Sequence, residues 1–413
     1  MLKCWSDFPG YHDFVKDQWQ SFQVSGWGGY VLKEKLKMMK NSPKEWHLNH
    51  GRNTTGRLNE VKDRMNVLDI KGEDEDLSDA DREKLRSLRR HNALVNLNVN
   101  GVQVEGVIGV REVVFNHFEH HFRSVRVPRP DIGNLQFQSI SEDDAYLLER
   151  PFSEEEVKQA VWDCESFKSP GPDGVNFGFI KEFWPHIKGD FMQFMLEFYT
   201  NGRLVKGSNC TFIVLISKFD NPQKVSYFRP IYLVGCMYKV LAKVLANRLK
   251  LIIGKVISES QSAFVKGRQI LDGILIANEL VDDAKKQKKE LILFKVDFEK
   301  AYDSVEWSYL DAVMDKMGFK CKWRQWIMSY ISTATASVLV NGSPIKEFSI
   351  GRGLRQGDPL SPFLFLIAAE GLNVILKASV DSGLFKGYQI GSDPLSRVSV
   401  SHLQFADDTL IIG

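Results

Sequence analysis

Three aspartates, Asp297, Asp407 and Asp408, stand where carboxylates could hold metal ions. Asp407 and Asp408 interrupt the apolar run HLQFADDTLIIG, where two strand-forming segments must reverse direction. Asp297 follows the apolar segment 291–296, so that it ends what we expect to be a buried strand. Clustered carboxylates repel one another unless cations bridge them, and Mg²⁺ takes oxygen ligands together with phosphate. Two such ions would stabilise the attacking and leaving oxygens of an in-line phosphoryl displacement.

Ordinary structural explanations compete with this interpretation. An Asp-Asp pair is common in turns because Asp tolerates turn backbone, although the apolar flanks here would bury the strands and hold the tip rigidly. Glu299 and Asp303 are further acids in the segment that follows Asp297. For Asp303 we favour a helix-capping or surface role.

A second set of polar residues lies in GRGLRQGDPLSPFLF, a loop that leads into an apolar helix beginning near Pro359. Gly353 and Gly357 permit close backbone approach, and Arg355 and Gln356 offer donors to a base, sugar or phosphate. A plain loop-to-helix junction would explain the glycines and prolines but not the Arg-Gln-Gly-Asp-Pro combination.

The elements that must position these residues mix helical and strand patterns. Ser153 and Glu156 form a Ser-x-x-Glu capping signal before a helical pattern, and Asn341-Gly342 is a strong hairpin signal. Further patterns predict a shaped turn at 168–174, strands at 212–216 and 291–296, and helices at 32–40, 237–249 and 307–317. This mixture predicts an α+β fold rather than a doubly wound one.

Bulk properties narrow the class of protein only slightly. The chain has 413 residues and a formal charge of +2, so any case for nucleic-acid binding depends on local residues. Its five cysteines are scattered without a CxxC pair, which argues against a structural zinc and against a disulfide framework. We saw no signal peptide and no membrane span, and expect an intracellular protein, in nucleus or cytoplasm, with no membrane partner. The charged stretch 73–90 and the basic run 285–289 are expected to be solvated.

In this order, FKVDFEKAYDSV, RGLRQGDPLSP and FADD resemble motifs A, B and C of LINE-type (non-LTR) retrotransposon reverse transcriptases, plant-like ones especially. KSPGPDG, FRPI, LANRL and QSAFVKGRQILDGIL precede them in the family's order. The resemblance implies a right-hand polymerase fold, α+β, with fingers and an incomplete palm containing an antiparallel sheet, the thumb absent, and a helical connector in front. Residues 1–150 would be the connector, 151–290 the fingers and start of the palm, and 291–413 the palm.

The resemblance also implies roles for individual residues. Asp297 and Asp407 would be catalytic and ligate two Mg²⁺ ions, for which Mn²⁺ could substitute, with Asp408 a weaker ligand. Tyr302, five positions after Asp297, would be the steric gate that excludes a 2′-hydroxyl. The remaining implied contacts are to the incoming nucleotide and nascent base pair (Lys218, Arg229, Gln356, Gly357) and to the template (Gly267, Arg268, Arg355).

The implied reaction is RNA-directed DNA synthesis, with an RNA template, a DNA primer and deoxynucleoside triphosphates as partners. Two departures from the family pattern lie near the expected triphosphate site: Ser217 replaces a proline, and Tyr232 replaces a small hydroxyl residue. We also expect a chain truncated at both ends, with negligible processive activity alone. A non-catalytic nucleic-acid-binding remnant is the alternative, a group II intron-type maturase is the second choice among polymerases, and the oligomeric state is left open.

Overall fold

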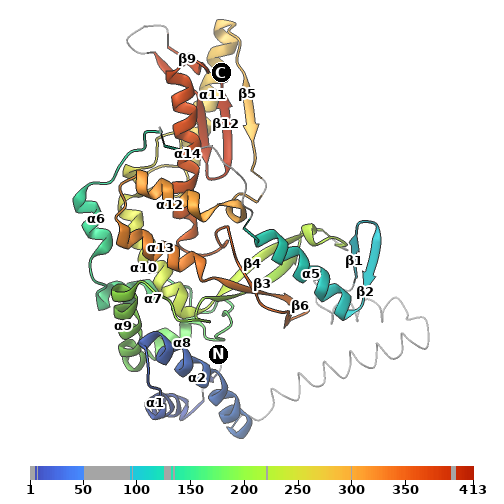
Figure 1. Ribbon diagram of the computed structural model, residues 1–413, viewed down its shortest axis with the longest axis vertical. Helices are drawn as coiled ribbons and strands as arrows, with labels where there is room; N and C mark the ends of the chain where they lie inside the picture. Colours follow the sequence, from blue (N-terminus) through green and yellow to red (C-terminus); the bar gives the residue numbers. More distant parts are fainter. Residues whose placement is uncertain are drawn as a thin grey trace.

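The protein is described by a computed structural model that covers residues 5–6, 8–50, 94, 96–124, 132–133, 135–219, 222–298, 300–391 and 397–413. The charged stretch 73–90 and Glu299 lie outside these ranges. The helices are α1 (Tyr11–Ser21), α2 (Gly28–His50), α5 (Val107–Phe122), α6 (Glu142–Glu149), α7 (Glu154–Trp162), α8 (Phe177–Glu182), α9 (Trp184–Asn201), α10 (Cys236–Ile252), α11 (Ile270–Gln287), α12 (Trp307–Lys316), α13 (Cys321–Ser332) and α14 (Ser361–Asp381) (Figure 1).

The strands are β1 (Asn96–Val99), β2 (Val102–Glu105), β3 (Cys210–Ser217), β4 (Phe228–Val234), β5 (Leu293–Val296), β6 (Thr335–Val340), β7 (Ser343–Pro344), β8 (Phe348–Ser349), β9 (Tyr388–Ile390), β10 (Val398–Val400), β11 (His402–Phe405) and β12 (Asp408–Ile412). Helices and strands are mixed along the chain, as the α+β prediction required.

The first sheet has the strand order β4-β3-β6-β7, with β8 also paired to β6. Its pairs are antiparallel except β3 with β6, which are parallel. The β6–β7 turn confirms the predicted hairpin, because Asn341 and Gly342 have φ angles of 51° and 80°, as such turns require. Strand β6 joins the sheet of β3 and β4, although β5, which lies between β4 and β6 in the sequence, belongs to another sheet.

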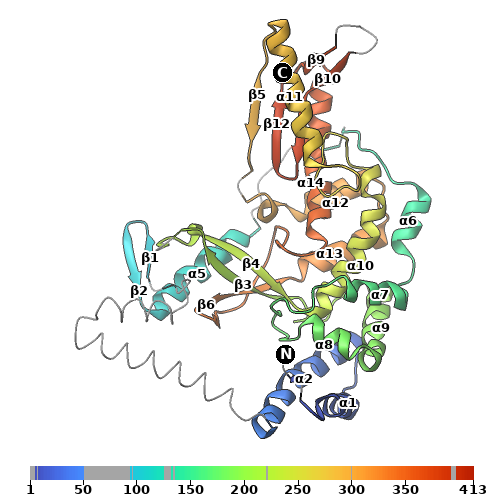
Figure 2. The same cartoon turned by 180° about the vertical axis from the view of Figure 1, so that it is seen from behind.

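The second sheet, β11-β12-β5, is antiparallel throughout and stands apart from the first in both views (Figures 1 and 2). β5 lies at its edge, and Phe294 is 60% exposed. The prediction of a buried strand before Asp297 was therefore wrong in its burial though right in its position. Apolar runs also occur in edge strands, and the sequence does not say which neighbours a strand will have.

Helix α14 runs from the centre of the molecule toward the second sheet (Figure 1). It is the one helix of the described chain that is long and apolar enough to cross a membrane. Its buried residues include the apolar Leu364 and Ile367 and the polar Glu370 and Asn373, and it packs against α10 and α12. A core helix of a folded domain passes the same test of length and composition, so this is weak evidence for a membrane span.

The region before residue 150 is joined closely to the region after it. Trp19 Nε1 donates to Asp190 Oδ2 at 2.9 Å, and Lys35 Nζ forms an ion pair with the same carboxylate at 3.0 Å. Leu36 belongs to the same hydrophobic cluster as the helices that follow residue 150. The expected helical connector also contains the β1–β2 hairpin, and α5 packs against the first sheet through Val114, Phe118 and Phe122.

Two residues of the predicted local motifs, Glu156 and Asp173, bind partners far along the chain. Ser153 Oγ accepts from the backbone N–H of Glu156 at 3.2 Å, which is the expected N-cap of α7. The Glu156 carboxylate instead makes a two-point ion pair with buried Arg248, at 2.7 and 2.8 Å. Asp173, in the predicted turn, accepts from Cys236 N at 2.5 Å and so caps α10. Burial raises the pKa of Asp173.

Candidate active site

The β11–β12 hairpin turns through Ala406 and Asp407, between the paired residues Phe405 and Asp408. Ala406 has φ of 55°, a left-handed conformation that non-glycine residues seldom adopt. The side chain of Gln261 secures it: Oε1 accepts from Ala406 N at 2.9 Å, and Nε2 donates to Ala406 O at 3.2 Å. Gln261 is 1% exposed. The turn that carries Asp407 is thus clamped through its backbone from a segment far away in sequence.

The segment around Gln261 also extends the second sheet. Gln404 N donates to Ser260 O at 2.7 Å, and Ser262 N donates to Gln404 O at 3.0 Å, so the segment lies parallel to β11. Gln261 is not among the site residues predicted from the sequence. The feature of the sequence that could have pointed to Gln261 is its position as the first residue of QSAFVKGRQILDGIL, one of the segments that resemble the family's motifs.

A buried polar network lies behind the hairpin, between β11 and α14. His402 Nε2 lies 2.8 Å from Asn373 Oδ1 and 3.0 Å from Ser260 Oγ. Glu370 accepts from the backbone N–H of Ser258 at 3.2 Å and from Asn373 Nδ2 at 2.9 Å. Burial lowers the pKa of His402 and raises that of Glu370. The network joins α14 to the loop that carries Gln261.

Asp407 lines a cavity of about 350 Å³. Apolar side chains of α14, among them Phe365 and Leu372, form much of its wall. The Tyr302 ring stacks on Phe365, with centroids 4.6 Å apart and planes 14° from parallel. Burial, and then the nearby charge of Asp407, raise the pKa of Tyr302 to about 12. Tyr302 therefore lies close to Asp407 and keeps its phenolic proton at neutral pH.

Asp408 faces a different environment from Asp407. Its carboxylate pairs with Lys295 of β5 at 3.2 Å, and it lines a separate pocket with Ile270 and Ile274 of α11. Asp297 is exposed and directly follows Val296, which pairs with Thr409. The structure therefore brings Asp297 to the same end of the sheet as the hairpin turn. Within the described residues, no group of three or more potential ligands is already assembled around a metal position.

The loop that begins at Gly351 is tied to the turn that follows Asp297. Gly353 N donates to Val305 O and Leu354 N donates to Tyr302 O, both at 2.8 Å. Gly353 has φ of 87°, and a Cβ on it would lie 2.6 Å from Asp303 O. This close approach requires glycine, so motif B and the Tyr302 turn form one rigid unit.

Asp303 is buried at 4% exposure, so the favoured capping or surface role was wrong. Its carboxylate accepts from Tyr232 Oη at 3.4 Å and lies 3.3 Å from His121 Nε2. Burial, and then Asp303, raise the pKa of Tyr232 well above its usual value. The bulky phenol that distinguishes this chain thus occupies the core, where it joins β4 to the Tyr302 turn.

Two of the three expected template contacts have other partners. Arg355 is buried: it donates to Asn209 Oδ1 at 2.7 Å and to Tyr238 Oη, and its guanidinium lies 4.0 Å from the Tyr238 ring centroid. Burial lowers its pKa to about 10, so it stays charged at neutral pH. Arg268 donates to the backbone carbonyls of Gln261 at 2.7 Å and Ile257 at 3.0 Å. In this conformation both arginines support the protein interior, because buried carbonyls and hydroxyls outcompete solvent for a guanidinium.

The remaining expected contacts are accessible. Lys218 and Arg229 are both exposed and lie diagonally on one face of the β3–β4 pair, since Ile216 is paired with Arg229. Gln356 is half-buried, and Gly357 and Gly267 are exposed with positive φ. These cations lie on the first sheet and the aspartates on the second, so the structure does not gather them into one closed pocket.

Comparison with known proteins identifies the domain that contains Asp297 and Asp407. Residues 216–413 match the family described as reverse transcriptase (RNA-dependent DNA polymerase). The Transposon TX1 uncharacterized 149 kDa protein of Xenopus laevis is 29% identical over 274 residues, which are 66% of this chain and 20% of that protein. The Pol polyprotein from the type-1 retrotransposable element R2 of Popillia japonica is 28% identical over 268 residues, 64% of this chain and 35% of that protein.

A third relative, the Pol polyprotein from the type-1 retrotransposable element R1 of Bradysia coprophila, is 26% identical over 267 residues, 63% of this chain and 24% of that protein. The chain thus spans between about a fifth and a third of the length of these relatives. Together with the hairpin that presents Asp407 beside Tyr302, these matches show that residues 216–413 form a reverse transcriptase domain similar to that of non-LTR retrotransposon Pol proteins.

Proposed function

We propose that this chain adds single deoxynucleotides, without processive extension, to a DNA primer on an RNA template, with Asp297 and Asp407 as the metal-binding carboxylates. The observation that carries the proposal is the rigid presentation of Asp407. The Gln261 clamp holds its turn, while the β5–β12 pairing brings Asp297 to the same end of the sheet. Carboxylate oxygens suit Mg²⁺, which usually completes its shell with water and substrate phosphate. An open pair of carboxylates fits that requirement better than a closed cage would.

The chain's own residues supply positioning and selectivity. Bound Mg²⁺ would supply charge neutralisation at the attacking and leaving oxygens. The Tyr302 ring, held on Phe365, offers a flat surface for the sugar of the incoming nucleotide, with its phenol protonated. Asp408 is already paired with Lys295, which favours Asp407 as the stronger ligand.

The same proposal assigns each of the two sheets to a part of the polymerase fold. The first sheet, with β3, β4 and β6, would be the fingers, and the second sheet with α11 and α14 would be the palm. Lys218 and Arg229 would then hold the triphosphate, because both are exposed cations on one face. Gln356, Gly357 and Gly267 remain the proposed contacts to the nascent pair and the template. Arg355 and Arg268 are left out because their guanidiniums are engaged by the protein.

Single-nucleotide addition on a primed RNA tests the proposal. Asp407→Asn keeps the shape of the side chain but removes its charge, and we expect at least a hundredfold loss of the Mg²⁺-dependent rate, since the metals supply several kcal/mol of transition-state stabilisation. The control is Asp381→Asn, at the exposed end of α14, which should leave the rate unchanged.

A second measurement does not depend on turnover. Mn²⁺ binding in the presence of a deoxynucleoside triphosphate, followed by electron paramagnetic resonance, should weaken in Asp297→Asn and Asp407→Asn, and less in Asp408→Asn. Equal Mn²⁺ affinity in all variants would overturn the assigned ligands. Nucleic-acid binding without any nucleotide addition by the unmodified chain would instead support a non-catalytic binding protein.

A further inference from the structure

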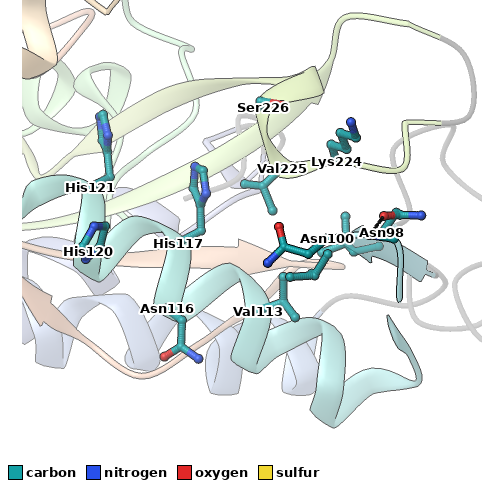
Figure 3. A pocket seen from close by; sticks show the side chains of 13 residues that line it. Asn98, Asn100, Val113, Asn116, His117, His120, His121, Lys224, Val225 and Ser226 are labelled. Atoms are coloured by element: carbon teal, nitrogen blue, oxygen red, sulfur yellow. Dashed lines mark hydrogen bonds between the residues drawn. The ribbon is translucent and has the colours of Figure 1, made fainter. Parts of the chain in front are cut away.

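A second cavity, of about 800 Å³, lies away from Asp407. Three elements enclose it: the turn of the β1–β2 hairpin, helix α5, and the connection between β3 and β4 (Figure 3). None of the site residues predicted from the sequence lines this cavity. Its volume falls within the range of pockets that hold small organic ligands, so it has room for more than a few water molecules.

The lining of this cavity is rich in hydrogen-bonding groups. Asn98 and Asn100 contribute amides, His117 and His121 imidazoles, and Lys224 an ammonium group. No carboxylate of the described chain lines it. The apolar Leu97, Val99, Val113 and Val225 complete the wall. Amides and rings beside a single cation suit a ligand with flat, hydrogen-bonding groups and few negative charges.

Two histidines of α5 present flat rings to the cavity. His117 and His121 both rise from α5 toward the β3–β4 strands, and their rings are nearly parallel, 10° apart (Figure 3). Burial, and then the charge of Lys300, lower the pKa of His117 to about 4. At neutral pH this imidazole is therefore neutral and can both donate and accept a hydrogen bond.

The walls are held together and lead toward the proposed active site. Asn98 N donates to Gln223 O at 2.6 Å, which fixes the hairpin to the β3–β4 connection. On one side Lys218 Nζ donates to the backbone carbonyl of the lining residue Ser226 at 3.2 Å. On the other side His121 contacts Asp303, which directly follows Tyr302. The cavity thus lies between Lys218, which we propose to bind the triphosphate, and the segment that contains Tyr302, the proposed steric gate.

We propose that this cavity seats unpaired nucleotides of a single-stranded RNA, with a base against His117, hydrogen bonds from Asn98 or Asn100, and a phosphate near Lys224. Single-stranded RNA is recognised by rings that stack on splayed bases and by side chains that bond to the base edges. The proposal rests on the proposed function, which makes an RNA template the partner. The RNA seated here is either the template strand itself or a separate RNA segment, and both present the same chemistry.

Fluorescence anisotropy with a short single-stranded RNA tests the site in the full chain. His117→Ala removes the stacking ring, and Asn100→Gly removes the amide while tolerating the φ of 51° at this turn. We expect His117→Ala to weaken binding by about tenfold, the effect usual for losing one base–ring stack. Asn100→Gly should weaken it by about threefold, the effect usual for losing one hydrogen bond. Both variants should bind a duplex RNA of the same length almost normally. His186→Ala, an exposed histidine on α9, is the matched control and should bind like the unmodified chain.

Further binding measurements identify which RNA occupies the cavity and test this proposal separately from the catalytic one. If the template is seated here, lengthening its single-stranded 5′ overhang on a primed duplex should tighten binding by the unmodified chain but not by His117→Ala. If a separate RNA is seated here, overhang length should have no effect while the short RNA still loses affinity in His117→Ala. Asp407→Asn should bind RNA normally, so a failure of the catalytic proposal leaves this result intact.

The site is overturned if His117→Ala and Asn100→Gly both bind single-stranded RNA like the unmodified chain, or if His186→Ala loses as much affinity as they do. Thermal unfolding shows whether either variant is folded. Should one fail to fold, crosslinking of 4-thiouridine RNA to the unmodified chain decides: crosslinks within 96–121 or 224–226 support the site, and their absence there excludes it.

Discussion

At the residue scale, the left-handed backbone of Ala406 shows how the Asp407 turn is held. An alanine gains nothing from φ of 55°, so the surrounding structure must compensate for the strain. The Gln261 amide does so with two hydrogen bonds inside the protein. Gln261 is therefore a positioning residue for Asp407, and it acts without touching substrate.

We predict that Gln261→Ala lowers the free energy of unfolding by about 1–3 kcal/mol, because buried backbone groups lose their partners. It should also lower kcat for nucleotide addition more than it changes KM, since the turn is displaced and the nucleotide contacts remain. Urea denaturation and single-turnover kinetics measure the two effects.

A second substitution separates positioning from simple loss of stability. Glycine adopts positive φ without strain, so Ala406→Gly added to Gln261→Ala should restore part of kcat. The exposed Gln287→Ala, at the end of α11, should change neither quantity. An unchanged kcat in Gln261→Ala would refute the positioning role.

The Tyr302 ring, rather than its hydroxyl, should govern sugar selection. Tyr302→Phe keeps the stack on Phe365 and should retain discrimination against ribonucleotides, whereas Tyr302→Val should raise ribonucleotide incorporation at least about tenfold, as expected when a steric clash worth 1–3 kcal/mol is lost. Because the pKa of Tyr302 is about 12, discrimination should not change between pH 7 and 9. Competition between labelled dTTP and UTP measures the ratio. Equal ratios in the valine and phenylalanine variants would contradict the gate.

At the element scale, the hairpin β11–β12 depends on a neutral histidine. His402 is buried between β11 and α14, where Asn373, Ser260 and Ser401 face its ring and Glu370 lies beside Asn373. Burial lowers its pKa below the ordinary 6.5, so the unfolded chain takes up the proton more readily than the folded one. His402 therefore contributes stability above about pH 6.5, and this contribution falls as the pH drops below that value.

We predict that the urea midpoint of the unmodified chain falls more between pH 7.5 and 5.5 than the midpoint of His402→Gln, which cannot take up the proton. His117, whose pKa is also lowered, and Glu370, whose pKa is raised, are present in both proteins, so their effects cancel to first order. The same pH dependence in both proteins would show that His402 does not titrate as proposed.

At the scale of the whole molecule, the first helices belong to the main hydrophobic core. Leu36 of α2 is 1% exposed and shares its cluster with residues of α9, α10 and α13. The polar contacts to Asp190 and the bond from Gly28 N to Glu197 Oε1 at 2.5 Å fix α2 against α9. We therefore expect α2 and α9 to unfold together.

Leu36→Ala should lower the free energy of unfolding by about 2–5 kcal/mol, the usual cost of a cavity in a packed core. Met38→Ala, whose side chain is 38% exposed on the same helix, should cost far less. Urea denaturation followed by tryptophan fluorescence and by circular dichroism measures both. A separate early transition that alone shifts in Leu36→Ala would mean that the first helices fold as an independent unit.

The sequence alone determined what depends on near neighbours along the chain. The Asn341-Gly342 hairpin, the turn before Asp408, the α7 cap at Ser153 and the apolar helix after Pro359 all formed where their patterns placed them. Turn backbones, caps and hydrophobic periodicity are set within a few residues, and the ordered motifs identified the family.

Only the tertiary structure decided what distant partners determine. Gln261 reaches Ala406 across 145 positions, and Arg355 reaches Asn209 across 146. The burial of Asp303 and Arg355, the exposure of β5 and the return of β6 to β3 depend in the same way on which segments meet. The type of a residue limits which bonds its side chain can make, but the fold decides which distant residue becomes the partner. An arginine expected on a template can therefore be a core residue, and an unremarked glutamine can hold the active-site turn.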